Sequence, residues 1–352
     1  MDFRYSDEDT AFLNEVRQFI TESTPEGWLG VDPGPEEEAD DTIYRMSLRN
    51  WRRLGEKGWI GLAWPKKYGG QEASLWKEMV MLQELAYRGC PGIDTAIIEA
   101  DLILQFGTEE QKRRFIPPIQ RGEVKWAIGM SEPNAGSDTF NIQLTAVEQD
   151  EAYVLNGQKI WSTGAHHAQR EVVYARTGPD KYRGVSVFLV DLSIPGISIR
   201  QIRQMTGLPA FCEVFFDNVR VPKEDLLGEK NGGLKILMYA FGAERTTGLF
   251  QLHNSRRYLD QLVDYCKCTV VDGEPLSDSA LIRSRLARIA IDIDIGISLG
   301  EQLNWIATSG MNTVKASSQI KVHGSRCIQR VAELGQEILG LYGQLNSDSK
   351  SV

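Results

Sequence analysis

The sequence predicts an α+β fold that is mostly helical, with a small β-barrel or sandwich domain between two helical regions. Apolar residues recur at helical spacing from Phe12 to Phe115. From Trp126 to Val221 the pattern changes to short runs of β-branched and aromatic residues, which Gly, Asp and Pro separate. The helical spacing returns from Gly232 onward. These observations predict an N-terminal α-helical domain at 1–123, a middle β-domain at 124–230 and a C-terminal helical bundle at 231–352.

The N-terminal region carries local signals for helix starts and stops. Ser6 is a candidate N-cap, and Thr108 with Gln111 has the spacing of a capping box. Residues 25–41 are acidic and contain Gly and Pro, so we expect an irregular loop there. The adjacent prolines within 115–119 are expected to end the helix that follows Thr108.

The middle region contains two polar islands. After the apolar run 126–129, residues 130–138 are rich in Pro, Asn, Gly and Ser, which form turns and offer backbone N–H groups and hydroxyls to a ligand. Further on, Asn156-Gly157 predicts a hairpin turn that would present Trp161 and its neighbours at a sheet edge. From the pattern alone, two polar loops on an ordinary β-domain explain these islands equally well, because neither contains a metal or nucleophile motif.

The C-terminal region predicts three long antiparallel helices, which form most of a helical bundle. The first begins after Gly232 and ends at a turn over 271–275. The second covers 281–305 and the third about 312–341.

Composition excludes several classes of partner and location. The net charge of −9 argues against nucleic acid or an anionic membrane surface as a partner. No apolar run approaches the roughly 20 residues that a membrane span needs. The N-terminus is acidic and has no apolar signal segment, so the cytoplasm is the expected location. A dinucleotide fingerprint and a P-loop are both missing from the sequence.

We expect no metal site and no disulfide framework. The five cysteines are scattered, and Cys266 with Cys268 has no second ligand pair at zinc spacing, so both are interpreted as buried or partly buried thiols on a helix. His166 and His167 are adjacent, and we expect both to be solvated or hydrogen-bonded. His253 and His323 lie in helical stripes and are expected to be hydrogen-bonded within the bundle.

Two long motifs carry a resemblance to a known family. Met130-Ser-Glu-Pro-Asn-Ala-Gly-Ser-Asp138, followed by Leu155-Asn-Gly-Gln-Lys-Ile-Trp-Ser-Thr-Gly164, resembles the flavin-binding middle domain of the acyl-CoA dehydrogenase family. The domain order is similar to that of the family along essentially the whole chain. The resemblance implies FAD-dependent oxidation of an acyl-CoA thioester to the 2,3-enoyl-CoA, with electron-transfer flavoprotein as the expected acceptor. A base removes the α-proton and a hydride passes from the β-carbon to the flavin.

The resemblance also assigns catalytic residues. Some family members carry the general base on the first helix of the C-terminal bundle, where Glu244 stands in Phe241-Gly-Ala-Glu-Arg-Thr-Thr-Gly248. We expect its apolar neighbours to hold this carboxylate in an apolar site; an exposed or arginine-paired structural glutamate is the alternative. Arg245 is similar to the family arginine that steadies the active-site loop. No other residue of the sequence is assigned to catalysis.

Five residues are implied as flavin contacts. Met130 and Ser131 would contact the ring, and Ser137 lies where the family contacts the FAD phosphate or the substrate. Trp161 would stack near the isoalloxazine, with Thr163 bonding to its N5 edge. The alternative for Trp161 is an ordinary core aromatic residue.

The chain also departs from the family pattern. Residues 269–275 stand where relatives often have Arg-x-x-Phe-Gly reaching the FAD pyrophosphate of a neighbouring subunit. The sequence stops at Val352, so the last helix of the family is apparently missing and the bundle is expected to expose an apolar face. We therefore expect a homo- or hetero-oligomer, either dimer or tetramer. Two alternatives stay open: a non-catalytic or half-site subunit of a hetero-oligomer, and a flavin oxidase on the same fold.

Overall fold

The computed structural model describes residues 5–30, 42–93, 96–205, 209–245 and 247–345. The chain forms two compact units, and each is assembled from separate stretches. The bundle unit comprises Met1–Asp32, Ser74–Pro91 and Gly242–Val352, and the sheet unit comprises Pro33–Ala73 and Gly92–Phe241. The division into domains at 1–123, 124–230 and 231–352 stays a prediction.

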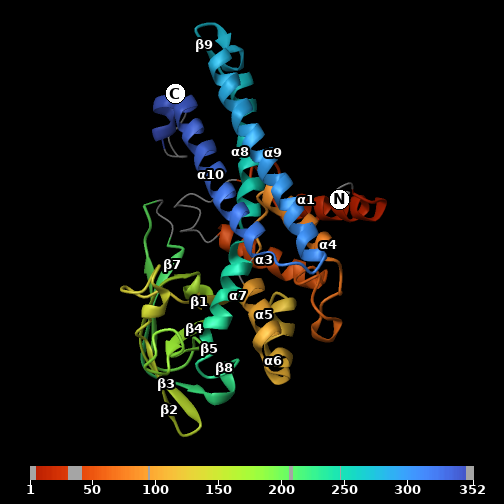
Figure 1. Cartoon of the computed structure of the whole chain (residues 1–352). Coiled ribbons are helices and arrows are strands. Elements are labelled where there is room, and N and C mark those ends of the chain that lie inside the picture. Colours follow the sequence, from red (N-terminus) through yellow and green to blue (C-terminus); the bar gives the residue numbers. More distant parts are fainter. Residues whose placement is uncertain (1–4, 31–41, 94–95, 206–208, 246, 346–352) are drawn as a thin grey trace. The chain divides into compact units, whose positions relative to one another are not determined.

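The bundle unit is built from helices that surround an apolar core. Its elements are α1 (Asp7–Ser23), α4 (Leu75–Tyr87), α8 (Thr247–Cys268), a hairpin of β9 (Val270–Val271) and β10 (Glu274–Pro275), η5 (Leu276–Asp278), α9 (Ala280–Thr308), α10 (Val314–Leu339) and η6 (Gly340–Gln344). In Figure 1, α8, α9 and α10 lie side by side, and buried Leu252, Ile293 and Ile320 belong to their common core. The helical spacing of the C-terminal region therefore predicted the second and third helices correctly.

Glycines allow the bundle helices to approach closely. A Cβ atom added at Gly248 of α8 would lie 2.7 Å from the carbonyl oxygen of Ile320 in α10, and one at Gly324 would meet the carbonyl of Gly248. On α9, Gly296 leaves room for the side chain of Leu252. The backbones of α8 and α10 are consequently in direct contact where they cross.

The helices of the sheet unit are held by short-range caps as well as by packing. They are α3 (Thr42–Glu56), η1 (Lys66–Tyr68), α5 (Ala96–Phe106), α6 (Glu109–Gln120), η2 (Thr139–Asn141), η3 (Ala165–His167), η4 (Lys223–Asp225) and α7 (Gly233–Arg245), whose last residues belong to the bundle unit. The predicted capping box of α6 is confirmed, because Thr108 Oγ1 accepts from the N–H of Gln111 at 3.2 Å and Gln111 Oε1 accepts from the N–H of Thr108. Ser6 likewise caps α1.

The sheet of this unit contains β1 (Trp126–Gly129), β2 (Thr145–Gln149), β3 (Ala152–Thr163), β4 (Arg170–Arg176), β5 (Val185–Asp191), β6 (Ile197–Ile202), β7 (Phe211–Pro222) and β8 (Leu226–Leu227). The strands are ordered β6-β7-β3-β2-β4-β5-β8, and β1 pairs in parallel with β4. A core that includes Leu155, Val173, Phe188 and Val214 lies on this sheet. The predicted mostly helical α+β fold with a central β-domain is confirmed.

The predicted hairpin at Asn156-Gly157 is wrong. Strand β3 runs without interruption through these residues, and its pairing with β7 shifts register between Leu155 and Gly157. Gly157 has φ +138°, and a Cβ atom there would lie 2.9 Å from the Cα atom of Leu144, so glycine is required for a β-bulge rather than a turn. The chain reverses instead at Asp150, which has φ +51° between β2 and β3.

Two further expectations need correction, and a third is met as far as the structure describes it. Pro117 and Pro118 do not end α6, because the carbonyl of Pro117 still accepts from the N–H of Arg121 and the helix continues to Gln120. Cys266 is buried as expected, whereas Cys268 is exposed. Of the loop predicted at 25–41, residues 25–30 are irregular and 31–41 lie outside the described residues.

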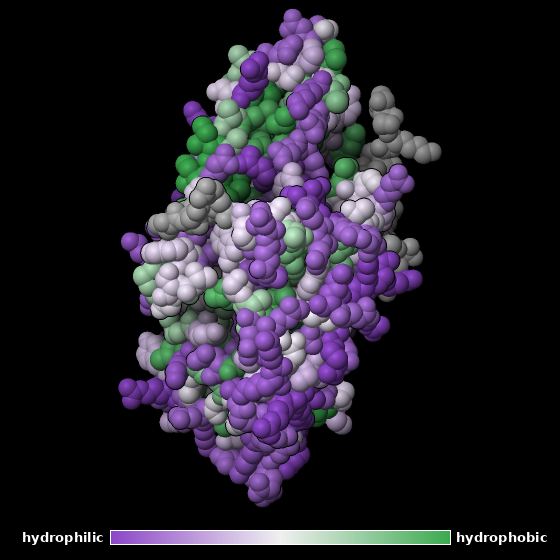
Figure 2. Space-filling view, turned by 90° about the vertical axis from the view of Figure 1, so that its right-hand side faces the viewer, coloured by the Kyte–Doolittle hydropathy of each residue, from purple (hydrophilic) through white to green (hydrophobic). Residues whose placement is uncertain are grey.

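Apolar side chains are exposed on the bundle unit. Figure 2 shows hydrophobic surface on the upper part of the molecule, where Figure 1 shows the bundle helices. The exposed apolar residues of α9 and α10 include Leu281, Ile291, Ile295, Trp305, Val314 and Val322. Of the helices described, none combines the length and the apolar character needed to cross a membrane.

Candidate functional site

The first polar island forms a tight loop at the end of β1. Trp126 and Ala127 are buried, whereas Met130 and Ser131 are half-buried at the point where the strand ends. The loop closes through two backbone hydrogen bonds between Glu132 and Ala135, of 2.9 and 3.0 Å. Ser137, beyond this closure, is exposed. The loop is therefore ordered by its own backbone, with Met130 and Ser131 accessible on its strand side.

A buried ion pair holds this loop against β3. Lys159 is fully buried, and its Nζ donates to Glu132 Oε1 at 2.8 Å and to the carbonyl oxygen of Met130 at 3.2 Å. Glu132 also accepts from the backbone N–H groups of Gln143 and Leu144, at 2.7 and 3.0 Å. Burial lowers the pKa of Lys159 to about 8, and the charge of Glu132 opposes this shift. Both hydrogen bonds of the Lys159 ammonium are thus made to residues of the loop.

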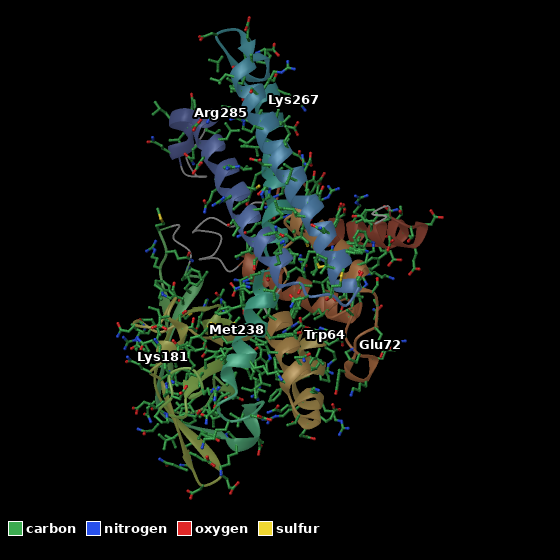
Figure 3. All side chains as sticks on the ribbon, in the orientation of Figure 1. Trp64, Glu72, Lys181, Met238, Lys267 and Arg285 are labelled. Carbon is green, nitrogen blue, oxygen red and sulfur yellow. The ribbon has the colours of Figure 1, made fainter. Side chains whose placement is uncertain are left out.

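The outer part of the loop has additional support. Thr139 Oγ1 donates to the carbonyl of Gly136 at 3.0 Å, and the Asn141 amide donates to the carbonyl of Asn134 at 3.0 Å. Lys181, labelled in Figure 3, pairs with Asp138 at 2.8 Å on the surface. These bonds fix the backbone of 130–138, as a ligand-binding loop requires.

The second island lies at the end of β3, next to the first. The N–H of Ile160 donates to the carbonyl of Ser131 at 2.9 Å, which joins the two islands. A register shift between Ile160 and Ser162 leaves Trp161 as the extra residue of a bulge, with φ +66°. Its indole is 54% exposed and meets Phe211 edge-on at 6.0 Å. Trp161 is therefore not a core aromatic residue, and that alternative is wrong.

The arrangement of these residues fits a flavin. A left-handed backbone costs a bulky residue on the order of 1–3 kcal/mol, and such strain is typical of ligand sites. Within the described chain, the hydroxyls of Ser131, Ser137 and Thr163 have no hydrogen-bond partner, and a Cβ atom at Gly164 would meet nothing within 4 Å. A flat exposed indole beside unpaired hydroxyls and an open backbone suits a planar ring with a polar edge.

The predicted catalytic residues lie in the bundle unit, at the end of α7. Glu244 is exposed in the single chain, so the expected apolar surroundings are not provided by neighbours along the helix. It forms no ion pair with any residue in the described ranges, so its surroundings agree with the exposed-glutamate alternative and not with the arginine-paired one. The neighbouring Arg245 is half-buried, and its Nη1 donates to Ser318 Oγ of α10 at 3.3 Å. Arg245 thus ties the end of α7 to the bundle.

A buried carboxyl group behind the first loop was missed by the sequence analysis. Glu171 of β4 is fully buried, and burial raises its pKa to about 7. The Ser162 hydroxyl and the Lys159 ammonium oppose this rise, although the described residues offer Glu171 no hydrogen bond of normal geometry. The available signal was a glutamate directly after Arg170, at the start of a strand whose residues 172–175 are apolar. Lys159 and Glu132 were likewise present in the motifs but were not assigned a role.

The histidines differ in their surroundings. His166 Nδ1 lies 3.2 Å from Cys212 Sγ, and the His167 ring stacks on Tyr44 with centroids 3.6 Å apart, so this pair is not simply solvated. His323 contacts the carbonyl of Asp292 at 2.6 Å, as expected for a hydrogen-bonded bundle histidine. The same expectation is wrong for His253, whose Nε2 has no partner among the described residues and whose pKa burial lowers to about 4.

Comparison with known proteins identifies the family. Residues 6–123, 127–219 and 231–350 match the N-terminal, middle and C-terminal domains of acyl-CoA dehydrogenase. The acyl-CoA dehydrogenase FadE26 of Mycobacterium tuberculosis is 30% identical, over 99% of this chain and 89% of FadE26.

Solved structures agree with these matches. The ChsE4-ChsE5 complex from Mycobacterium tuberculosis has a TM-score of 0.85 at 29% identity, covering 99% of this chain and 89% of that chain. The Tcur3481-Tcur3483 steroid ACAD has a TM-score of 0.85 at 25% identity, with coverage of 99% and 89%. The domain matches together span most of the sequence, and the chain belongs to the acyl-CoA dehydrogenase family and is a flavoprotein oxidoreductase.

Proposed function

We propose that this protein uses FAD to convert an acyl-CoA thioester into the 2,3-enoyl-CoA. The observation that carries the proposal is Trp161, a strained and half-exposed aromatic residue held beside the loop of Met130 and Ser131. Bound FAD would accept the hydride from the substrate β-carbon. In this proposal Trp161 covers the ring, Met130 and Ser131 contact it, Thr163 bonds to its N5 edge, and Ser137 contacts a phosphate or the substrate.

Glu244 is proposed as the general base that takes the α-proton. A carboxylate is the appropriate base only where a substrate or partner removes it from water, because the α-proton of a thioester is weakly acidic. An exposed Glu244 on the last turn of α7 is available to a substrate that covers it. Arg245 positions this turn through Ser318. The assignment of both residues rests on their match to the family motif.

We further propose a bulky acyl group and a hetero-oligomer. One structural relative is described as a steroid ACAD and another as a complex of two different proteins. Exposed apolar residues on α9 and α10 supply a surface that such association would cover. Electron-transfer flavoprotein as acceptor and a cytoplasmic location stay proposals. A non-catalytic half-site subunit and a flavin oxidase remain the rival functions.

The first test is the absorbance spectrum of the purified protein with a panel of acyl-CoA esters. We expect a flavin band that one ester bleaches without oxygen and that returns slowly in air. A colourless protein that takes up no FAD would instead favour the half-site subunit. Rapid return of the band in air would favour the oxidase. Bleaching by short straight-chain esters, but not by bulky ones, would contradict the proposed substrate class.

Trp161→Ala is expected to weaken FAD binding about tenfold, because loss of an aromatic contact costs about 0.5–1.5 kcal/mol in addition to lost apolar contact. The apo-protein should retain its stability, since the indole is half-exposed. The measurements are a fluorescence titration with FAD and thermal unfolding of the apo-protein.

Trp305→Ala is the matched control for this variant, because Trp305 is also an exposed tryptophan but lies on α9. It should leave FAD affinity unchanged. Equal FAD affinity in wild type and Trp161→Ala would remove Trp161 from the flavin site.

A further inference from the structure

We propose that Glu171 is a positioning residue of the flavin site, which supports the loop of residues 130–138 (the flavin loop) from behind and adjusts the reduction potential of the bound flavin through its own proton. This inference rests on the proposed function, because it requires flavin on the face formed by Met130, Ser131 and Trp161. Glu171 does not touch that face, so it acts through the backbone and through the electrostatic potential.

The first argument is the position of Glu171 relative to the loop. In β4, Glu171 is in register with Ala127 of β1 and with Val190 of β5. A Cβ atom added at Gly129 would lie 2.7 Å from Glu171 Oε1 and 3.1 Å from Lys159 Cγ. The carboxyl group therefore packs against the backbone of the residue that directly precedes Met130. A side chain at position 129 would therefore displace the Glu171 carboxyl group.

The second argument is the contact with the other island. Ser162 of β3 is fully buried, lies beside Glu171, and directly follows Trp161. It is in register with Cys212 of β7, whose Sγ lies 3.2 Å from His166 Nδ1. Glu171 thus packs between the two segments that carry the flavin contacts. A change in the size or charge of the Glu171 side chain would therefore affect both segments, because Gly129 directly precedes Met130 and Ser162 directly follows Trp161.

The third argument is an imbalance of buried charge. The groups that face Glu171 are Lys159 and Ser162 from β3 and Cys212 from β7. Lys159 is engaged by Glu132 at 2.8 Å, and Arg176 adds positive charge near Lys159. The Lys159 ammonium is therefore the one positive group near both Glu132 and Glu171 among these groups, and of the two carboxyl groups it forms a hydrogen bond only with Glu132. Neither oxygen of Glu171 has a hydrogen bond of normal geometry among the described residues, which is rare for a buried carboxyl group.

Ionisation of Glu171 consequently has a defined effect on the flavin. As the neutral acid, Glu171 adds no charge behind the loop. As the anion, it places a negative charge in a low-dielectric region close to Met130, where charges interact strongly. A negative charge disfavours the uptake of electrons by the bound flavin. Because burial raises the pKa of Glu171 to about 7, the change of state falls near neutral pH.

The test compares the reduction potential of the bound flavin in wild type and Glu171→Gln from about pH 5 to about pH 9. At low pH the two proteins should have the same potential, because both side chains are neutral. Above neutral pH the wild-type potential should fall further than that of Glu171→Gln, so that the difference grows and then levels off. Parallel curves in two flavin-loaded proteins would overturn the inference and leave the proposed function intact.

Two further variants complete the experiment. Ser162→Ala removes the hydroxyl that opposes the raised pKa, so the pH at which the extra fall occurs should move upward. This variant also tests the inference if Glu171→Gln does not fold. Glu148→Gln, at an exposed ion pair in β2, is the matched control and should give the wild-type curve. Failure of the wild type to bind flavin at any pH would overturn the proposed function and the inference together.

Discussion

Glu244→Gln is expected to lower the rate of acyl-CoA oxidation by about 10²–10⁴-fold, the usual contribution of a general base. The amide has nearly the same shape as the carboxylate but cannot accept the α-proton. Flavin binding should be retained, because the residues proposed to contact the flavin belong to the sheet unit and Glu244 to the bundle unit. The measurement is the rate of flavin bleaching after rapid mixing with the preferred acyl-CoA ester under anaerobic conditions.

Glu333→Gln is a suitable control for this prediction. Glu333 is an exposed glutamate of α10 in the same unit, and its replacement should leave the bleaching rate unchanged. A Glu244→Gln protein that bleaches at the wild-type rate would show that the base lies elsewhere. If neither wild type nor variant bleaches although both bind FAD, the half-site alternative would be favoured.

Lys159→Met is expected to destabilise the protein by about 3–5 kcal/mol, the usual cost of leaving one member of a buried ion pair without its partner. Lys159 is fully buried, and its loss leaves the buried Glu132 carboxyl group of the loop without its ammonium partner. The loss also removes the bond to the carbonyl of Met130, so FAD affinity should fall as well. Urea unfolding of the apo-protein at neutral pH measures the first effect and an FAD titration the second.

The Lys181–Asp138 pair provides a control of equal geometry. Its Nζ–Oδ2 distance is also 2.8 Å and it lies at the end of the same loop, but both side chains are about half-exposed. Lys181→Met should therefore change the free energy of unfolding little, since solvent screens an exposed pair. Similar losses in Lys159→Met and Lys181→Met would mean that burial does not decide the strength of these pairs.

The elements governed by local rules could be predicted from the sequence. The caps at Ser6 and Thr108 depend on residues three positions apart, and both are present. The Asn156-Gly157 prediction failed because the same two residues suit a tight turn and a bulge. The pairing of β3 with both β2 and β7 keeps the strand continuous through these residues. Because β7 is distant in the sequence, a local pattern could not show this pairing.

The site shows the same division between local and distant information. Met130, Ser131 and Trp161 could be selected because they stand in continuous motifs. Glu171 could not, because its importance depends on the parallel pairing of β1 with β4 and on the closeness of Lys159. The choice between an apolar site and an exposed position for Glu244 could not be made from the sequence, since apolar neighbours along a helix do not determine which direction one side chain faces.

The close crossing of α8 and α10 makes the bundle sensitive to a single methyl group. Gly248, near the start of α8, follows Glu244 by four positions in the sequence, and Gly324 packs directly on the carbonyl of Gly248. Alanine at Gly324 would move the two helices apart and displace the start of α8, next to the segment that bears Glu244. Random mutagenesis of α10 should therefore yield variants at this position that fold and bind FAD yet turn over slowly, far in sequence from any motif of the family.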